Sequence, residues 1–363
     1  MKYIDEYRNP DLAERLSRRI HNLARAGRDY NFMEVCGTHT NTFFKFGLRT
    51  LLSSNVRLIS GPGCPVCVTD ASYIDNAISL AGIKGSVIAT YGDMIKVPGS
   101  SSSLEREKAR GRDIRVVYSS LDALSIAEDN PSENVIFLAV GFETTAPASA
   151  VALLEARKRK IKNFFVYSGH KLIPPAMKYL LKDPDARIDG FILPAHVSAI
   201  IGAGAYGFLV RSGVFSVIAG FEPLDMLQGI AILLEQMKSG RPRIEIQYDR
   251  VVRKSGNIKA RGVLKKVFAV YDSGWRGLGL IPKSGLRIRS EFKYFDAERR
   301  FKIKNRSSSG RRSYCICPDV LKGKNIPTDC RLFAKSCTPE RPKGPCMVSG
   351  EGICGVYYRY AKA

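Results

Sequence analysis

The chain has 363 residues, 45% of them hydrophobic and nine of them cysteines, and its formal net charge is +23. This length and hydrophobic content allow a buried core and suggest two domains or three. No apolar run is long enough to span a bilayer, and the charged N-terminus, MKYIDEYRNPDLAERLSRRI, is typical of an amphipathic helix rather than a signal peptide. We therefore predict a cytoplasmic protein without membrane contact, in which clustered cysteines bind metal or perform redox chemistry more often than they form structural disulfides.

Eight short β-branched or aromatic runs follow one another between about residues 30 and 222, each followed by a loop and a helical pattern. The runs begin at Phe32, Val56, Ser86, Ile114, Val135, Phe164, Gly190 and Phe215. Strands that alternate with helices predict parallel α/β layers, and nearly all-apolar strands indicate sheets that are buried on both faces. The predicted fold class is therefore α/β, with two parallel-sheet lobes that face a cleft.

Grouping these runs in chain order predicts the domain organisation. An N-terminal helix falls in residues 1–29, one α/β domain in 30–125 and a second in 126–240. Residues 241–363 then hold a basic segment with alternating character, a linker at 306–312 and a small cysteine-rich module.

The loops that follow the predicted strands are rich in glycine and polar residues: CGTHT, GPGCPVC, TYGDM, GFETTAP, SGHK, LPAHVS and GFEP. Open α/β sheets place their sites at the carboxyl ends of strands, so these loops predict a functional cleft. Three of the four histidines lie in them (His39, His170 and His196), together with Asp93, Glu143 and Lys171. We expect these side chains to share one polar pocket with a role in proton transfer or in holding polar ligands. The GAGAYG stretch at 202–207 fits a dinucleotide-binding pattern, but close helix packing explains it equally well.

Cys36, Cys64 and Cys67 form a first cysteine group in two of these loops. Cys36 ends a strand and precedes a helix, where backbone N–H groups and the helix dipole should lower the pKa of its thiol. Because both loops lie at one sheet edge, the three thiolates can converge, and three soft donors suit iron, zinc or copper(I) with a coordination position left open. The alternative is a reducible disulfide in the Cys-x-x-Cys pair with a lone buried cysteine.

The second group holds six cysteines within residues 313–363, in a Pro/Gly-rich segment with little room for a core: Cys315, Cys317, Cys330, Cys337, Cys346 and Cys354. Their spacing matches neither a zinc ribbon nor a ferredoxin. A metal-organised module is still the best interpretation, in which four cysteines hold a [4Fe–4S] cluster and two form a dithiol pair. Two disulfides with spare thiols, without metal, are the alternative.

The motifs MEVCGTHT, GPGCPVCVT, GFETTAP, SGHKLIPPAM, PAHVSAIIG, GFEPLD and CTPERPKGPCMVSGEGIC resemble those of the HypD family of hydrogenase maturation factors. The resemblance runs from about residue 32 to 358. It implies two α/β domains and a [4Fe–4S] module. It also implies a scaffold and redox function in assembling the Fe(CN)2CO centre of [NiFe] hydrogenases, with a HypC-type chaperone and a HypE-type cyanide donor as partners.

The resemblance also implies roles for individual residues. Cys36, Cys64 and Cys67 would hold the iron, with the latter two as a dithiol that binds iron or passes electrons to it. Cys315, Cys330, Cys337 and Cys354 would bind the cluster, and Cys317 and Cys346 would form the redox pair. His39 would donate protons or hydrogen bonds in the cleft, and Asn41 stands where family members often have a second histidine, which it can replace only as a hydrogen-bonding group.

Two other functions remain open from the sequence. The first is a cluster-dependent thiol–disulfide reductase of the ferredoxin:thioredoxin reductase type. The second is nucleic acid binding through residues 238–312, which hold 22 Lys or Arg against 6 Asp or Glu, a surplus of +16 (22 − 6). This stretch could equally be the solvated surface of a protein from a hot environment. The RNA-binding and zinc-finger patterns are missing, so we expect no nucleic acid partner.

Overall fold

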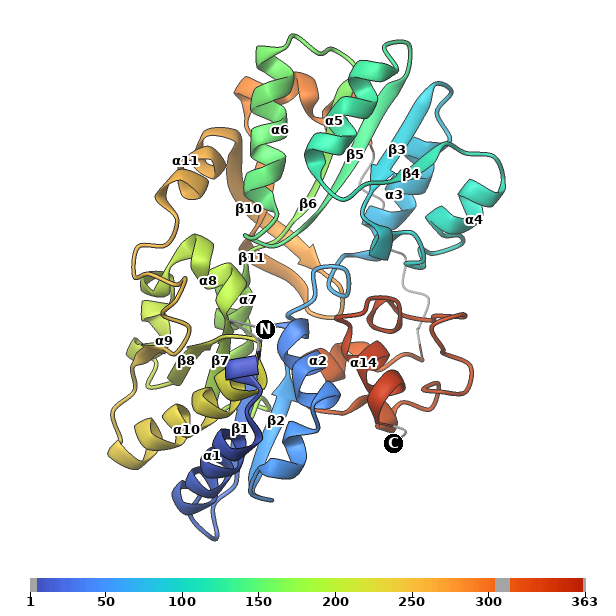
Figure 1. Cartoon of the computed structure of the whole chain (residues 1–363). Helices are drawn as coiled ribbons and strands as arrows, with labels where there is room; N and C mark the ends of the chain where they lie inside the picture. The colour runs from blue at the N-terminus through green and yellow to red at the C-terminus, as the bar shows by residue number, and fades with distance from the viewer. Residues whose placement is uncertain (1–4, 304–313, 362–363) are drawn as a thin grey trace.

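A computed structural model describes residues 5–303 and 314–361 of the chain, and the linker predicted at 306–312 lies outside them. The architecture is α/β, with two parallel sheets, a β-hairpin and a cysteine-rich C-terminal region (Figure 1). All eight runs predicted to be strands are strands. In the described part of the chain, no helix is long and apolar enough to cross a membrane.

The first sheet has five strands in the order β2-β1-β7-β8-β9, and the second has four in the order β4-β3-β5-β6. The strands of the first sheet are β1 (Tyr30–Glu34), β2 (Val56–Ser60), β7 (Gly190–Pro194), β8 (Phe215–Ala219) and β9 (Ile244–Ile246). Those of the second are β3 (Ser86–Thr90), β4 (Ile114–Val116), β5 (Asn134–Gly141) and β6 (Phe164–His170). A hairpin, β10 (Phe268–Trp275) and β11 (Gly279–Ile288), packs beside β6.

This pairing corrects the predicted grouping of strands. The sequence placed the strands of 30–125 in one lobe and those of 126–240 in the other. In the structure β1 pairs with β7, while β3 pairs with β5, so each sheet takes strands from both ranges. The chain leaves the first sheet after β2, builds the second sheet, and returns at β7. Apolar parallel strands of similar composition do not encode which neighbour they pair with, so chain order alone gave the wrong grouping.

The helices cover the sheet faces and connect parallel strands, as right-handed crossovers require. They are α1 (Pro10–Leu23), α2 (Gly37–Lys45), α3 (Ala71–Ala81), α4 (Leu104–Ala109), α5 (Ser120–Asp129), α6 (Ala146–Lys158), α7 (Ile173–Leu180), α8 (Ala195–Ile201), α9 (Gly207–Arg211), α10 (Pro223–Ser239), α11 (Ile258–Val267), α12 (Ala297–Arg300), α13 (Cys317–Leu321) and α14 (Ile353–Tyr360). The predicted N-terminal helix is α1, which begins at Pro10 and is capped by the Asn9 side chain. The basic segment is less uniform than its alternating character suggested, because Asn257 caps a helix, α11, before β10 begins.

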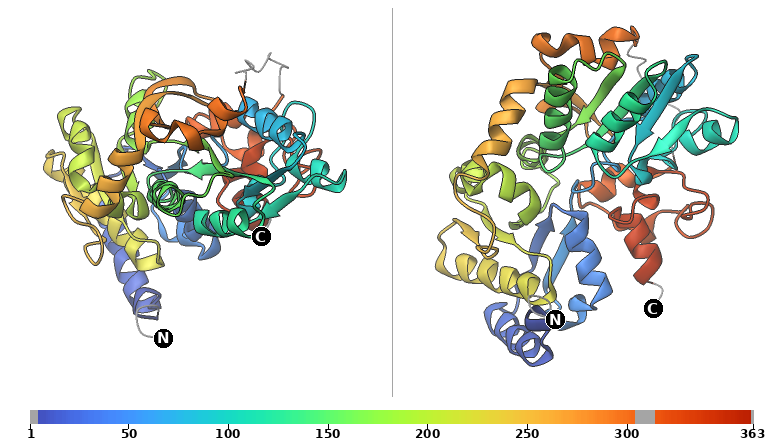
Figure 2. Two further views of the ribbon diagram at one scale, coloured as in Figure 1. Left: turned by 90° about the horizontal axis from the view of Figure 1, so that it is seen from above. Right: turned by 45° about the horizontal axis from the view of Figure 1, so that its top comes forward.

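One hydrophobic core joins both sheets to the C-terminal region. It contains Met33 from β1, Ile136 from β5, Trp275 from the hairpin and Ile353 from α14, and also Cys67, Cys317 and Cys346. Two further cores lie against outer faces, one between the first sheet and helices α1 and α10, the other between the second sheet and helices α5 and α6. The cysteine-rich region, residues 314–361, therefore packs against both sheets and lies beside α2 (Figures 1 and 2).

The GAGAYG stretch serves backbone packing. A Cβ atom on Gly202 would lie 2.4 Å from the amide nitrogen of Gly256 and 2.4 Å from the carbonyl oxygen of Lys254. Gly202 also has a φ of +82°, which favours glycine. Close approach of the 253–256 segment therefore accounts for this glycine.

Candidate functional site

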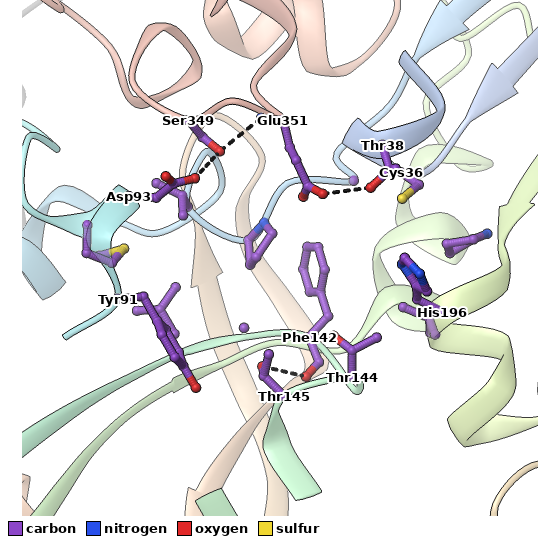
Figure 3. A pocket seen from close by; sticks show the side chains of 18 of the residues that line it. Cys36, Thr38, Tyr91, Asp93, Phe142, Thr144, Thr145, His196, Ser349 and Glu351 are labelled. Carbon is purple, nitrogen blue, oxygen red and sulfur yellow. Dashed lines mark hydrogen bonds between the residues drawn. The ribbon is translucent and has the colours of Figure 1, made fainter. Parts of the chain in front are cut away.

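A cavity of about 700 Å³ lies where the two sheets and the cysteine-rich region meet (Figure 3). Its lining comes from loops that are far apart in the sequence: Cys36 and Thr38 after β1, Tyr91 and Asp93 after β3, Phe142, Thr144 and Thr145 after β5, His196 after β7, and Ser349 and Glu351 before α14. The prediction of a cleft at the carboxyl ends of the strands is confirmed.

Cys36 carries the one thiol in the lining of this cavity, among the residues that the structure describes. It follows β1 and is the N-cap residue of α2, with an exposed fraction of 8%. Burial, and to a smaller extent the nearby negative charge of Glu351, raise the pKa of the Cys36 thiol to about 11. The backbone N–H groups of Thr38 and His39 lower it, as expected for a helix N-terminus, but the cost of burying a thiolate is larger. The prediction of a lowered pKa for Cys36 is therefore wrong.

A chain of hydrogen bonds links the cysteine-rich region to both sheets around this cavity. Thr38 Oγ1 donates to Glu351 Oε1 at 2.6 Å, and Ser349 Oγ donates to Asp93 Oδ2 at 2.7 Å (Figure 3). The backbone N–H of Glu351 donates to Ser349 Oγ at 3.2 Å. The segment that carries Ser349 and Glu351 therefore spans the cavity from α2 to the loop after β3.

Sequence reasoning missed Ser349 and Glu351. Glu351 lies in the stretch SGEG between Cys346 and Cys354. A charged residue that is flanked by glycines and lies between two predicted site cysteines was the one feature of the sequence that could have indicated a functional role. The backbone here is packed tightly against α2, since a Cβ on Gly37 would lie 2.1 Å from the carbonyl oxygen of Glu351.

The predicted gathering of histidines and charged residues in one pocket is only partly correct. Asp93 and His196 line the 700 Å³ cavity, but Lys171 and Glu143 line two others. His170 is buried, and its Nε2 lies 2.9 Å from Ser149 Oγ. Although their loops share a sheet edge, these side chains therefore lie in separate cavities.

His39 is not among the described residues that line the cavity. It is fully buried, with its Nε2 3.2 Å from the carbonyl oxygen of Ala219, and its ring packs against Phe221 at 4.9 Å between centroids. Burial lowers the pKa of His39 to about 4, so the ring is neutral at pH 7. Phe221 also stacks on His196, at 3.9 Å, which joins His39 to the cavity wall through one aromatic ring.

The loop of Cys64 and Cys67 contacts the loop of Cys36 through its backbone. A Cβ on Gly63 would lie 2.3 Å from the amide nitrogen of Cys36, so only glycine permits this approach. Cys36 lines the 700 Å³ cavity, however, whereas neither Cys64 nor Cys67 is among its described lining residues. Burial raises the pKa of Cys67, whose thiol hydrogen-bonds with those of Cys346 and Cys64. Within residues 5–303 and 314–361, no three His, Cys, Asp or Glu side chains are arranged to hold a single metal ion.

The six C-terminal cysteines separate into two neighbouring groups. Cys317 Sγ and Cys346 Sγ lie 2.7 Å apart and are buried. Burial raises the pKa of Cys354, and the neighbouring thiols of Cys315, Cys337 and Cys330 raise it further. Four thiols thus surround one region, and soft thiolates are the donors that iron–sulfur clusters take. A four-iron cluster spaces its ligands more widely than a single ion does, so this arrangement fits a cluster better than one metal ion.

Contacts between thiols connect the two cysteine-rich parts of the chain. Cys64 lies against Cys67, Cys67 against Cys346, and Cys346 against Cys317. Cys317 in turn hydrogen-bonds with Cys315, a member of the group of four. We call this series the thiol relay (Cys64, Cys67, Cys346, Cys317 and Cys315). It passes from the loop of Cys64 and Cys67 to the group of four thiols.

Comparison with known proteins agrees with the resemblance in the sequence motifs. A family model for HypD, described as "Hydrogenase formation hypA family", matches residues 11–361. The chain is 47% identical over 371 residues to the hydrogenase maturation factor HypD of Cupriavidus necator, with 100% of this chain and 98% of the relative covered. It is 46% identical over 370 residues to HypD of Azotobacter vinelandii (100% and 97% covered) and 43% identical over 367 residues to HypD of Escherichia coli (99% and 98% covered). With its motifs, its cavity and these relatives in agreement, the chain belongs to the HypD family of hydrogenase maturation factors.

Proposed function

We propose that this protein is a cytoplasmic scaffold and redox protein on which the Fe(CN)2CO centre of [NiFe] hydrogenases is assembled, with the iron bound by Cys36 in the 700 Å³ cavity. The observation that carries this proposal is the position of Cys36, whose thiol lines a cavity built by both sheets and the cysteine-rich region. Iron that carries strong-field ligands prefers a soft thiolate, and a partly enclosed cavity keeps water away from it.

The cavity wall has groups that could accept the proton of Cys36 and bind the cyanide ligands of the iron. Binding iron requires the thiolate, so metal uptake must release the proton that burial holds on Cys36. Glu351, next to Thr38, can accept that proton or relay it to solvent. Thr144 and His196 offer hydrogen-bond donors to the nitrogen ends of cyanide ligands, whereas the Thr145 hydroxyl already donates to the carbonyl oxygen of Phe142.

The thiol relay would move electrons to the Cys64 and Cys67 pair by thiol–disulfide exchange. With Cys64 and Cys67 oxidised to a disulfide, the thiolate of Cys346 attacks Cys67 and releases Cys64 as a thiolate. The thiolate of Cys317 then attacks Cys346, which releases Cys67 and leaves a Cys317–Cys346 disulfide. A [4Fe–4S] cluster held by Cys315, Cys330, Cys337 and Cys354 would supply the electrons that reduce this second disulfide. In this scheme Cys64 and Cys67 transfer electrons, rather than binding iron beside Cys36 as the resemblance implies.

A HypC-type chaperone and a HypE-type cyanide donor are the proposed partners. The cavity opens beside Tyr118, whose side chain lines it and is 93% exposed. Val116 and Leu121, next to it, are 45% and 43% exposed. Exposed apolar side chains at the mouth of a site favour docking of a protein that delivers or receives the cargo. Tyr118→Ser should weaken a pull-down of the chaperone without changing the thermal stability of this chain.

The second candidate function is a cluster-dependent thiol–disulfide reductase, which the thiol relay itself favours. Infrared spectroscopy separates the two. The protein is purified without air from cells that also produce the HypC-type and HypE-type partners. A scaffold should then show cyanide and carbonyl stretching bands. A reductase should lack these bands and should reduce a protein disulfide such as that of insulin, and this result would overturn the scaffold.

A further inference from the structure

A second cavity, of about 480 Å³, lies beyond the loop that carries Cys64 and Cys67. Its walls come from Asp70 and Tyr73 at the start of α3, Tyr167 and Lys171 at the end of β6, and Tyr271 in the hairpin. None of the nine cysteines lines it among the described residues. The function proposed above therefore assigns no role to this cavity.

Lys171 is the unusual side chain in this wall. It is 5% exposed, and its Nζ donates to Ser273 Oγ at 3.1 Å and to the carbonyl oxygen of Gly274 at 2.6 Å. Both of these acceptors are neutral; the ammonium also lies 5.6 Å from the centre of the Trp275 ring, and the negative charge of Asp70 raises its pKa. A buried ammonium is costly unless an anion pairs with it, and two neutral acceptors leave one of its three protons available. Burial accordingly lowers the pKa of Lys171 to about 8.

Three carboxylates face the same cavity. They belong to Asp70, Asp272 and Glu298. Asp70 accepts hydrogen bonds from Ser72 through Oδ1, which leaves Oδ2 for a ligand. With one ammonium against three carboxylates, the formal charge of the lining is negative. A simple anion is therefore repelled, while a simple cation is repelled by Lys171 and competes with it for the negative charge of Asp70.

Tyrosine hydroxyls complete the polar lining. Tyr73 and Tyr167 stack face to face, with centroids 4.3 Å apart and an angle of 5° between the rings. The Tyr73 hydroxyl donates to the backbone oxygen of Tyr167, whereas the Tyr167 hydroxyl accepts a bond from Asn76 and keeps its own proton to donate. These rings hold the wall rigid, so the charged groups stay in fixed positions.

From these groups we propose that the 480 Å³ cavity is a binding site for a free α-amino acid, whose carboxylate pairs with Lys171 and whose ammonium pairs with Asp70 and Asp272. A molecule with both charges satisfies the buried ammonium and the surrounding carboxylates together. The proposal is independent of iron binding at Cys36, because the two cavities share none of their described lining residues.

The test is isothermal titration calorimetry of the full chain with each of the twenty protein L-amino acids. At least one should bind with one site per chain. Its decarboxylated and deaminated analogues, and the variant Lys171→Met, should each bind about tenfold more weakly or worse, since one hydrogen bond to a charged group is worth about 1.5–3 kcal/mol. Lys178→Met, which alters an exposed lysine on α7, should bind as the unmodified protein does.

Two results would overturn the proposal: none of the twenty amino acids binds, or Lys171→Met binds as tightly as the unmodified protein. Should Lys171→Met fail to fold, Asp272→Asn carries the same test, because Asp272 is exposed at the rim. Unchanged affinity in Asp272→Asn would then contradict the proposed pairing of the ammonium.

Discussion

Thr38 Oγ1 donates a hydrogen bond to Glu351 Oε1 at 2.6 Å, joining two residues that are 313 positions apart in the chain. Thr38 lies two residues after Cys36 on α2, and Glu351 lies three residues before Cys354 in the cysteine-rich region. This contact places a carboxylate from the proposed cluster-binding region beside the proposed iron ligand. Glu351 thereby raises the pKa of the Cys36 thiol.

The first prediction concerns that charge. Glu351→Gln should lower the pKa of Cys36 from about 11, because removing a nearby negative charge makes the thiolate easier to form. At a given pH below that value, a larger fraction of Cys36 would then be thiolate. The rate of iodoacetamide alkylation of the Cys36 peptide, followed by mass spectrometry across pH, measures this shift. Glu340→Gln, an exposed acid of the same region, serves as the control. If the pKa of Cys36 were unchanged or higher in Glu351→Gln, Glu351 would not be the charge that raises it.

The second prediction tests the contact between the loops of Cys36 and Cys64. Gly63→Ala should destabilise the protein by about 1–3 kcal/mol, as overpacking of a filled site does, because its Cβ would lie 2.3 Å from the Cys36 nitrogen. Urea unfolding measures this change. Gly350→Ala is the matched control, since a Cβ there has no neighbour within 4 Å. Equal unfolding free energies for the two variants would mean that the loops do not touch as described.

The strands could be predicted from the sequence, since an apolar run such as VIFLAV encodes a buried strand locally, and so could the place of Cys36 in a loop at the cleft. The sheet that each strand joins could not, because β1 pairs with β7, across more than 150 residues of chain. The prediction that the pKa of Cys36 is lowered was wrong for a related reason. The helix N-terminus is visible in the sequence, whereas the burial that outweighs it depends on the whole cavity. Glu351 was missed because its partner, Thr38, is distant in the chain.

The third prediction tests the thiol relay. In a protein lacking Cys64 and Cys317, the remaining neighbours Cys67 and Cys346 should form a disulfide under mild oxidation, because their thiols are in hydrogen-bond contact. Peptide mapping by mass spectrometry identifies the bond. In the control variant that lacks Cys67 and Cys317, Cys64 and Cys346 should pair far less. Equal yields from the two variants would rule out a defined order of contacts.

The fourth prediction separates the cluster thiols from the redox pair. After anaerobic reconstitution with iron and sulfide, Cys354→Ser should lose most of its inorganic sulfide, because Cys354 lies among the thiols of Cys315, Cys330 and Cys337. Cys346→Ser should retain its sulfide, since Cys346 contacts Cys317 and Cys67 instead. Chemical analysis of iron and sulfide per chain measures both. An undiminished sulfide content in Cys354→Ser, or a loss of sulfide in Cys346→Ser, would contradict the assignment of Cys354 to the cluster and of Cys346 to the redox pair.

The central claim is that the iron cargo binds at Cys36, and infrared spectroscopy of Cys36→Ala tests it most directly. The variant and the unmodified protein are purified without air from cells that produce the partner proteins, and inorganic sulfide is measured on the same samples. The account predicts that Cys36→Ala loses the cyanide and carbonyl bands while its sulfide content stays unchanged. Bands of undiminished intensity in Cys36→Ala would contradict it.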